Sequence, residues 1–221
     1  MSQPNFVDSF SQQFELDPAK TALIVVDMQN ATGNRNMGLG KLLAKAGKAE
    51  DAAFRFDRIE QLVVPNIQKL LAHFRKINAA IIYITYGAET PDAQDVPAHM
   101  KPIVTATNNI VGHPEHEIVS ELTPLEGELV LNKTTQGSFR STKIDTALKA
   151  MGMEAVVCVG VSTNNCVAMT AMEACDAQYK VVIVGDATGT DSQEMQDSTL
   201  KMLGRLWSKV MNTDDVIARL V

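Results

Sequence analysis

The sequence predicts an α/β protein built on a doubly wound, mostly parallel sheet with helices on both faces. Five short runs rich in Val and Ile are nearly continuous in apolar character, as strands buried on both faces are. Segments with helical apolar spacing separate these runs, and this alternation is typical of a parallel sheet. The chain has 221 residues, 45% of them apolar, which is enough for one sizeable core. We therefore expect one domain over residues 1–221, with residues 1–17 as an N-terminal arm.

The predicted strands are bounded by polar or glycine residues, which marks where each apolar run ends. A sixth, less apolar segment is a candidate for a last strand before a C-terminal helical turn. In chain order the segments are TALIVVD (21–27), AAIIYITY (79–86), ELVLNK (128–133), EAVVCVG (154–160), KVVIVGD (180–186) and KVMNT (209–213).

Helices are predicted where apolar residues recur at i, i+3 and i+4. Pro65 either opens the regular part of the first of these helices or kinks it. The segments 30–57 and 87–127 are long and bear Gly, Asn or Pro, as binding loops and lids often do. The predicted helices cover residues 58–77, 142–152, 164–178 and 191–206.

The composition argues against several classes of partner. A net charge of −6 leaves no basic footprint for nucleic acid or an anionic membrane surface. The first residues lack the basic start and apolar core of a secretory signal, and no apolar stretch is long enough to cross a membrane. Three widely spaced cysteines do not suggest a disulfide framework, so we predict a cytoplasmic protein.

Reactive side chains follow three of the predicted strands. Asp27 ends the first, with Gln29 and Asn30 behind it; Lys133 ends the third; Cys166 follows the fourth, in the opening turn of the next helix. Ligands of open α/β sheets bind outside the carboxyl ends of the strands, so these side chains are expected to converge there. Each one alone is more often a turn residue, a solvated charge or a small core residue.

Cys166 is the best candidate nucleophile among the three cysteines. The unpaired N–H groups and positive dipole at a helix start favour its thiolate form. Cys158 lies in the middle of a Val-rich strand and is predicted to be a core residue. Cys175 lies nine residues beyond Cys166, about half a helical turn away around the axis, and is predicted to face elsewhere.

The three groups complement one another in acyl transfer. A thiol needs a base to accept its proton, and a carboxylate with a raised pKa can do this and later protonate the leaving group. A neighbouring ammonium stabilises the thiolate. No histidine closely follows a predicted strand, which argues against a Cys-His pair.

Three separated motifs in this order resemble the isochorismatase-like superfamily of cysteine hydrolases. This superfamily includes nicotinamidases, N-carbamoylsarcosine amidohydrolases, ureidoacrylate hydrolases and biuret hydrolases. The resemblance runs from about residue 18 to the C-terminus. The matching stretches are TALIVVDMQN around Asp27, GHPEHEIVSELTP leading to ELVLNKTTQGSF around Lys133, and VCVGVSTNNCVAMTAMEACDAQYKVVIVGDAT around Cys166.

The resemblance implies a role for each of these positions. Cys166 corresponds to the nucleophile, Asp27 to the general base and later acid, and Lys133 to the residue that tunes both. The family typically has a cis peptide bond four residues before the cysteine, here Val161–Ser162, and the N–H groups of Ser162 and Cys166 then form an oxyanion hole. The family also implies a homodimer or homotetramer. The apolar side chains in residues 10–16 and 37–57 are candidates to cover a neighbouring subunit's site, and whether the long segments 30–57 and 87–127 act as lids or as subunit contacts stays open.

The chain departs from the nicotinamidase pattern, and this bears on metal and substrate. The metal-binding Asp-x-His of nicotinamidases has no counterpart in TYGAETPDAQDVPAHM after the second strand. His113 and His116, at i and i+3, invite a metal interpretation, but they correspond to a loop in the family. We therefore predict no metal and no cofactor.

Amide and guanidinium side chains near the expected site predict a small ureide or N-carbamoyl amide as substrate. Arg has the geometry to bind a carboxylate with two hydrogen bonds, and amide side chains pair with the carbonyl and N–H groups of a ureide. The candidate substrate contacts are Gln29, Asn30, Arg35, Asn36, Gln193 and Gln196, with Arg140 a further possibility.

Two alternatives to a cysteine amidohydrolase stay open at this point. An isochorismatase-type vinyl ether hydrolase does not require a cysteine nucleophile, so Cys166 favours the amide reaction. A catalytically silent member of the fold is disfavoured because all three triad positions are filled.

Overall fold

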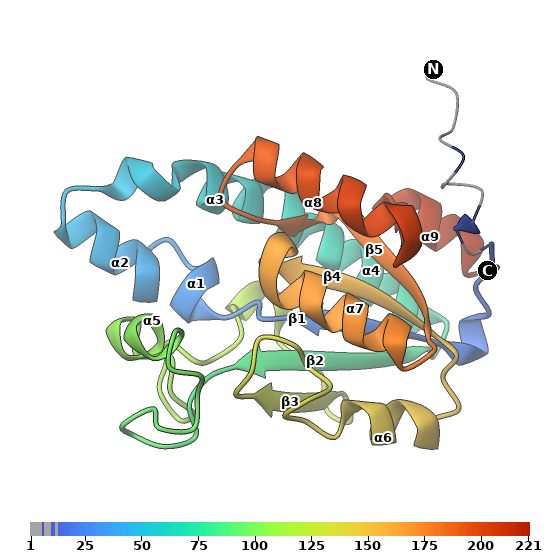
Figure 1. Ribbon diagram of the computed structural model, residues 1–221, viewed down its shortest axis with the longest axis horizontal. Coiled ribbons are helices and arrows are strands. Elements are labelled where there is room, and N and C mark those ends of the chain that lie inside the picture. The colour runs from blue at the N-terminus through green and yellow to red at the C-terminus, as the bar shows by residue number, and fades with distance from the viewer. Residues whose placement is uncertain (1–5, 7–9, 12) are drawn as a thin grey trace.

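The computed structural model describes residues 6, 10, 11 and 13–221 and has at its centre one parallel sheet (Figure 1). All pairings between its six described strands are parallel, in the order β3-β2-β1-β4-β5-β6, which confirms the predicted fold class. The strands are β1 (Thr21–Val26), β2 (Ala80–Tyr86), β3 (Leu129–Lys133), β4 (Ala155–Val161), β5 (Lys180–Gly189) and β6 (Lys209–Met211).

Helices cover both faces of the sheet. On one face, apolar side chains of α4 and α9 pack with those of the strands. On the other face α6, α7 and α8 do the same. The helices are α1 (Asn30–Gly33), α2 (Gly38–Lys45), α3 (Ala53–Arg58), α4 (Val64–Lys76), α5 (Lys101–Ala106), α6 (Ile144–Ala150), α7 (Ala168–Asp176), α8 (Gln193–Leu206) and α9 (Thr213–Arg219). Shorter helical turns are η2 (Pro18–Lys20), η3 (Ala49–Ala52), η4 (Ile59–Val63), η5 (Ser120–Leu122) and η6 (Thr163–Val167).

The strand order reverses between β1 and β4, because successive strands run outward from β1 on one side and from β4 on the other. A parallel sheet opens a crevice at such a point, outside the carboxyl ends of the strands. The arrowheads in Figure 1 point towards a group of small helices, α1, α2 and α5, which belong to the segments 30–57 and 87–127. Both segments thus lie at the edge where the sequence analysis expects a site.

The predicted helix 58–77 is more complex than its apolar pattern indicates. The chain forms α3, then the wider π-type turn η4, then α4, without leaving the helical conformation. Pro65 lies at the start of α4. A proline has no N–H to donate, so the change from π-type to α-helical winding falls where a hydrogen bond is already missing.

The end of the predicted N-terminal arm packs on its own chain. Leu16 is buried and Phe14 packs against the core. The Lys209 ammonium donates to the Phe14 carbonyl at 2.6 Å and lies 4.4 Å from the centre of its ring. Residues 1–5, 7–9 and 12 of the arm lie outside the described residues. The interpretation of residues 10–16 as a cover for a neighbouring subunit stays a prediction.

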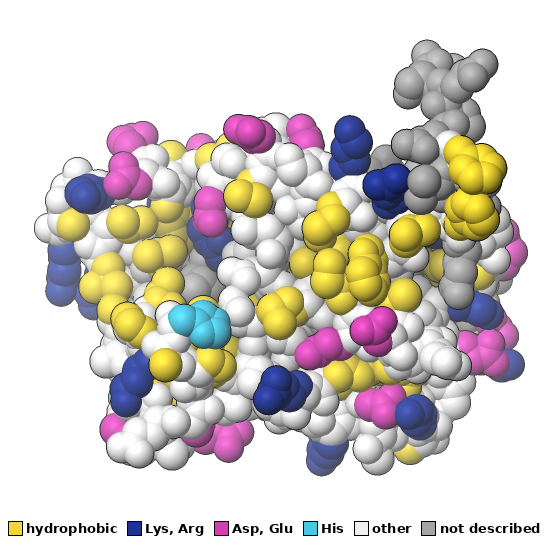
Figure 2. All heavy atoms as spheres, in the orientation of Figure 1, with side chains coloured by type: hydrophobic (Ala, Val, Ile, Leu, Met, Phe, Trp, Pro, Cys, Tyr) yellow, Lys and Arg dark blue, Asp and Glu magenta, His cyan; other side chains and the backbone are white. Residues whose placement is uncertain are grey.

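Acidic and basic side chains are interspersed over the face shown in Figure 2. An apolar patch lies among them over α7 and α8. The exposed apolar side chains of these two helices are Met169, Met195, Met202 and Leu206. Among the described residues, no helix is both long enough and apolar enough to cross the membrane. The predicted homodimer or homotetramer stays a prediction.

Gly160 at the end of β4 allows the close approach of β1 and β4 at the crevice. Its φ is +109°, and a Cβ built there overlaps the carbonyl oxygen of Val26. We expect Gly160→Ala to lower the free energy of unfolding by about 3 kcal/mol, because the added methyl meets rigid backbone and φ is unfavourable. Urea unfolding measures this change.

Gly47→Ala is the matched control for that substitution. Gly47 also has a positive φ of +69°, but a Cβ there has open space around it. Its free energy of unfolding is expected to fall by only about 1 kcal/mol. Equal losses in the two variants would contradict the steric explanation.

Candidate active site

Asp27 lies immediately after β1 at the switch in strand order. Its φ is +51°, a left-handed conformation that Asp tolerates better than most residues. Its N–H donates to the Ile84 carbonyl at 2.8 Å, and its side chain is buried. Burial raises the pKa of the carboxyl above its ordinary value, although the Lys133 cation opposes that rise. Oδ1 has no hydrogen-bond partner among the described residues and is free to accept a proton.

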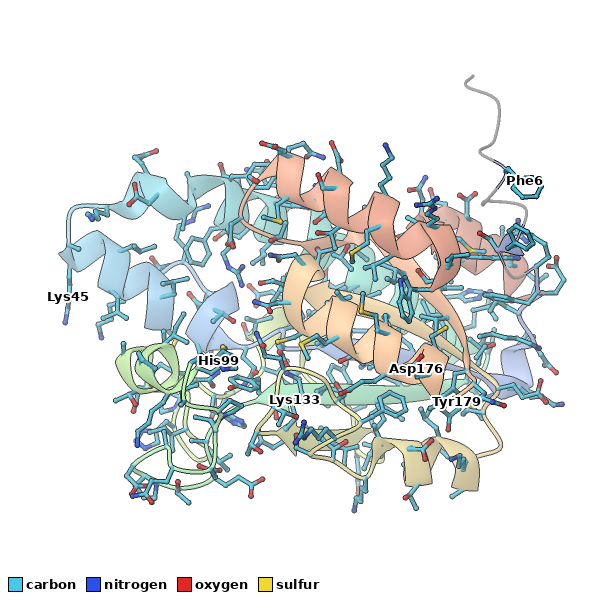
Figure 3. The ribbon with its side chains drawn as sticks, in the orientation of Figure 1. Phe6, Lys45, His99, Lys133, Asp176 and Tyr179 are labelled. Atoms are coloured by element: carbon cyan, nitrogen blue, oxygen red, sulfur yellow. The ribbon has the colours of Figure 1, made fainter. Side chains whose placement is uncertain are left out.

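Lys133 ends β3 with its side chain fully buried. Its Nζ donates to Asp27 Oδ2 at 2.9 Å and lies 4.4 Å from the centre of the Tyr86 ring. Burial alone would lower the pKa of the ammonium, but the negative charges of Asp27 and Cys166 raise it, and the net direction is upward. In Figure 3 Lys133 lies within the body of the protein, whereas Lys45 lies at its outer edge.

Cys166 lies in η6, the single turn between β4 and α7, and its side chain is 8% exposed. Burial and the Asp27 charge raise the pKa of the thiol to about 12, with Lys133 acting in the opposite direction. Desolvation thus opposes the thiolate that the start of a helix favours. Cys158 is buried in β4 and Cys175 packs against the core, as predicted.

The three groups form an electrically balanced cluster. Lys133 contributes one positive charge, and Asp27 and Cys166 interact with it and with each other. Burial raises the pKa of the carboxyl and of the thiol, and the Lys133 charge opposes both rises, so the resting thiol carries a proton. A substrate that draws sulfur into bond formation shifts that proton to the carboxylate without changing the net charge.

The backbone before Cys166 has the geometry implied by the family resemblance. The Val161–Ser162 peptide bond is cis. The Ser162 N–H donates to no described residue, while its carbonyl accepts from the N–H groups of Asn165 and Val167 at 2.9 and 3.2 Å. A free N–H beside a nucleophile is what an oxyanion hole requires.

A small cleft of about 180 Å³ opens beside the cysteine. Side chains from both long segments contribute to its wall, including Leu39 from α2 and Ile103 from α5. Its lining residues are Asp27, Gln29, Thr32, Leu39, Arg55, Tyr86, Met100, Ile103, Asn109, Val161, Ser162, Asn165, Cys166 and Asp191. Cys166 and Asp27 thus share a solvent-connected space that fits a compact substrate.

Comparison with known proteins identifies the family. The model of the Isochorismatase domain matches residues 21–215. The chain belongs to the isochorismatase family. The ureidoacrylate amidohydrolase RutB of Pseudomonas syringae pv. syringae is 27% identical, over 92% of this chain and 85% of its own.

Solved structures share the fold of this isochorismatase-family protein. A cysteine hydrolase from Pseudomonas syringae pv. phaseolicola superposes with a TM-score of 0.77 at 24% identity, covering 100% of this chain and 98% of its own. An N-carbamoylsarcosine amidase from Thermoplasma acidophilum superposes with a TM-score of 0.66 at 24% identity, covering 88% and 97% of the two chains.

The buried glutamines of this isochorismatase-family protein support the backbone instead of a ligand. Gln29 lines the cleft, but its amide is hydrogen-bonded to the backbone of Tyr86 and to the His116 carbonyl. Gln196 is 1% exposed, accepts from Thr163 Oγ1 at 2.7 Å and donates to the carbonyls of β5. Gln196 is therefore not a substrate contact: it fixes the turn that carries Cys166.

The other predicted substrate contacts lie outside the cleft. Arg35 forms ion pairs with Asp57 and Glu60 at 2.5 and 2.9 Å, so its guanidinium is already neutralised there. The remaining candidates are exposed or form hydrogen bonds within the protein. Asn30 donates to the Pro114 carbonyl, and the Asn36 N–H donates to Asn34 Oδ1. Gln193 donates to Asp197, and Arg140 is exposed. The prediction that Gln193 and Gln196 share one face is wrong. Gln193 is exposed to solvent, whereas Gln196 is buried in the core.

The two neighbouring histidines pair with asparagines. His113 Nδ1 lies 2.8 Å from Asn108 Nδ2, and His116 Nε2 lies 2.9 Å from Asn132 Oδ1. Within the described part of the chain, no group of three or more His, Cys, Asp or Glu side chains is placed to hold a metal ion.

Tyr86 and Arg55 are two of the cleft-lining side chains that the sequence did not point to. Tyr86 ends β2, pairs in register with Lys133, and buries an Oη that has no hydrogen-bond partner among the described residues. The strand-end rule that selected Asp27 also applies to Tyr86. Arg55 comes from α3, in a segment predicted as a loop, and no pattern in the sequence distinguishes it from Arg35.

Gln193→Ala is expected to leave the kcat/KM of this isochorismatase-family protein within about twofold of wild type, because the side chain is exposed and, among the described residues, is hydrogen-bonded to Asp197 alone. Steady-state kinetics measure this. Gln196→Ala, at the buried position one turn on, is expected to lower thermal stability because Thr163 loses its acceptor. A large fall in kcat/KM in Gln193→Ala would instead support the prediction from the sequence that Gln193 contacts the substrate.

Proposed function

We propose that this protein is a cysteine amidohydrolase that cleaves a small C–N amide of the N-carbamoyl or ureide type. The observation that carries the proposal is the buried Lys133–Asp27 ion pair, 2.9 Å long, beside a cysteine that lines the same small cleft. An ion pair that only stabilises the fold does not require a neighbouring thiol that lines a cleft. The names of the relatives, an amidohydrolase and an amidase, agree with this chemistry.

In the proposed reaction the Cys166 sulfur attacks the amide carbon while Asp27 Oδ1 accepts the thiol proton. The carbonyl oxygen becomes an oxyanion held by the N–H groups of Ser162 and Cys166. The C–N bond then breaks, and the Asp27 proton passes to the departing amine or ammonia, which leaves a thioester. A water molecule, deprotonated by Asp27, hydrolyses the thioester and returns the sulfur to the thiol.

The arrangement favours amide over vinyl ether hydrolysis. Cys166, Asp27 and Ser162 line one cleft, and this supports acyl transfer to sulfur, which needs a thiol, a base and a free backbone N–H close together. Lys133 remains charged throughout because its pKa is raised, so it keeps the negative charge of the pair near the reacting carbon.

The test is to incubate the purified protein with a panel of ureides, N-carbamoyl amino acids and simple carboxamides, and to follow ammonia release. Acid quenching and intact-mass spectrometry then report a covalent adduct on Cys166. Release of ammonia with an acyl or carbamoyl mass on the protein supports the proposal. Continued ammonia release by a variant that lacks Cys166 would refute the proposal.

A further inference from the structure

Arg55 brings a cation to the wall of the cleft. Its side chain is 6% exposed, and it is the only Lys, Arg or His among the described residues that line this space. Its Nε donates to the Thr32 carbonyl at 3.0 Å, and its Nη1 donates to Ser162 Oγ at 2.8 Å and to Asp191 Oδ1 at 3.1 Å. The guanidinium is thus held in place beside the residue that precedes η6.

Part of the guanidinium is unused. Nη2 carries two N–H groups, and neither has a hydrogen-bond partner in the part of the chain that the structure describes. Nη2 is also not among the fully buried atoms that lack a partner, so solvent in the cleft reaches it. Two adjacent donors on a planar cation match the two oxygens of a carboxylate.

The only ion-pair partner of Arg55 among the described residues is Asp191, and this pair is weak. Asp191 is 70% exposed and contacts Nη1 through one oxygen, at 3.1 Å. A singly bonded pair with one solvated partner contributes little and is easily exchanged. The catalytic cluster is electrically balanced by Lys133, so it does not compete for the Arg55 charge.

We infer that Arg55 selects substrates that carry a carboxylate, and that Asp191 occupies the guanidinium until such a substrate displaces it. This rests on the proposed function and narrows its substrate class to N-carbamoyl and ureido acids. The carboxylate binds across Nη1 and Nη2, and the carbamoyl carbon then lies towards Cys166, on the other wall of the same cleft. Asp191 swings into solvent, where it is already largely hydrated.

A different role for Arg55 is to position Ser162 through the hydrogen bond to Oγ. That role predicts equal losses for charged and neutral substrates, since the oxyanion hole serves both. Charge selection predicts a loss for the acid alone. The ratio between an acid and its uncharged twin therefore separates the two roles.

The experiment measures equilibrium binding to Cys166→Ser protein by calorimetry, which needs no turnover. The probes are N-carbamoyl-glycine and N-carbamoyl-β-alanine, each paired with its carboxamide. We expect at least one acid to bind about tenfold or more tightly than its carboxamide. Arg55→Met is expected to remove that preference, and Asp191→Asn to increase it. Arg35→Met, which removes an exposed guanidinium outside the cleft, is the matched control and leaves the preference intact.

A preference for the acid over its carboxamide that disappears in Arg55→Met and increases in Asp191→Asn supports the inference. Equal binding of acid and carboxamide, no measurable binding of either acid at millimolar concentration, or an equal loss for both probes in Arg55→Met overturns it. If Arg55→Met does not fold by circular dichroism, the exposed Asp191→Asn still decides, because an unchanged preference there contradicts the displacement. Ammonia release by wild-type protein from uncharged amides alone would leave the proposed function standing and the inference refuted.

Discussion

Cys166→Ala is expected to abolish amide hydrolysis, with kcat lower by about 10⁴-fold or more. The side chain lines the cleft beside Asp27, and no other described cysteine lines it. Without sulfur the proposed thioester cannot form, and only Asp27 and the backbone N–H groups of the proposed oxyanion hole remain to assist a direct attack by water. Ammonia release from the best substrate of the panel, followed over hours, sets the upper limit on residual activity.

The matched control is Cys175→Ala. Cys175 is half-buried on α7 and packs against the core, away from the cleft. Its removal is expected to lower stability by about 1 kcal/mol and to leave kcat within about twofold. Because Cys166 is itself buried, thermal unfolding of both variants shows whether a loss of activity reflects chemistry or misfolding. A folded Cys166→Ala protein with activity within tenfold of wild type would exclude the nucleophile assignment.

The strands were predictable because a parallel sheet covered on both faces demands continuous apolar residues, and the chain supplies them in five runs. The run TALIVVD became β1, with six consecutive buried residues. The first three residues of the weakly apolar KVMNT also form a strand, β6, which pairs with β5 at the edge of the sheet. The π-type turn η4 was not foreseeable, because apolar spacing does not distinguish a helix that widens by one residue per turn from a regular one.

The convergence of Asp27, Lys133 and Cys166 was predictable for a topological reason. Parallel strands send their carboxyl ends to one edge, so Asp27, Lys133 and Cys166 converge although up to 139 positions separate them. The residues that line the cleft for a substrate were not predictable in this way, because they depend on which arginine of the small helices points inward. Arg35 and Arg55 belong to one segment, and only the folded chain pairs the first with Glu60 and aims the second at the cleft.

Lys133→Met is expected to reduce kcat/KM by about 10³-fold and to move its acid limb to higher pH. Burial raises the pKa of Asp27, and the Lys133 charge partly offsets that rise. Removing the charge lets the pKa of Asp27 rise further, so the carboxylate needed as base is lost at a higher pH. A pH profile of kcat/KM measures the shift. The exposed Lys45→Met, which removes the same charge from the outer end of α2, is expected to leave the profile unchanged.

The stability of the Lys133→Met protein separates an electrostatic role from simple packing. An acid whose pKa is higher in the folded than in the unfolded state binds protons on folding, so its contribution favours the folded state at low pH and is lost as pH rises through the folded pKa. Because Asp27 is buried with no other described ion-pair partner, this dependence becomes steeper once Lys133 is gone. The unfolding free energy of the Lys133→Met protein should therefore approach that of wild type as the pH is lowered from neutrality into the acid range. A deficit that stays constant over this range would mean that Lys133 only fills space, and the charge balance proposed for the catalytic cluster would fail with it.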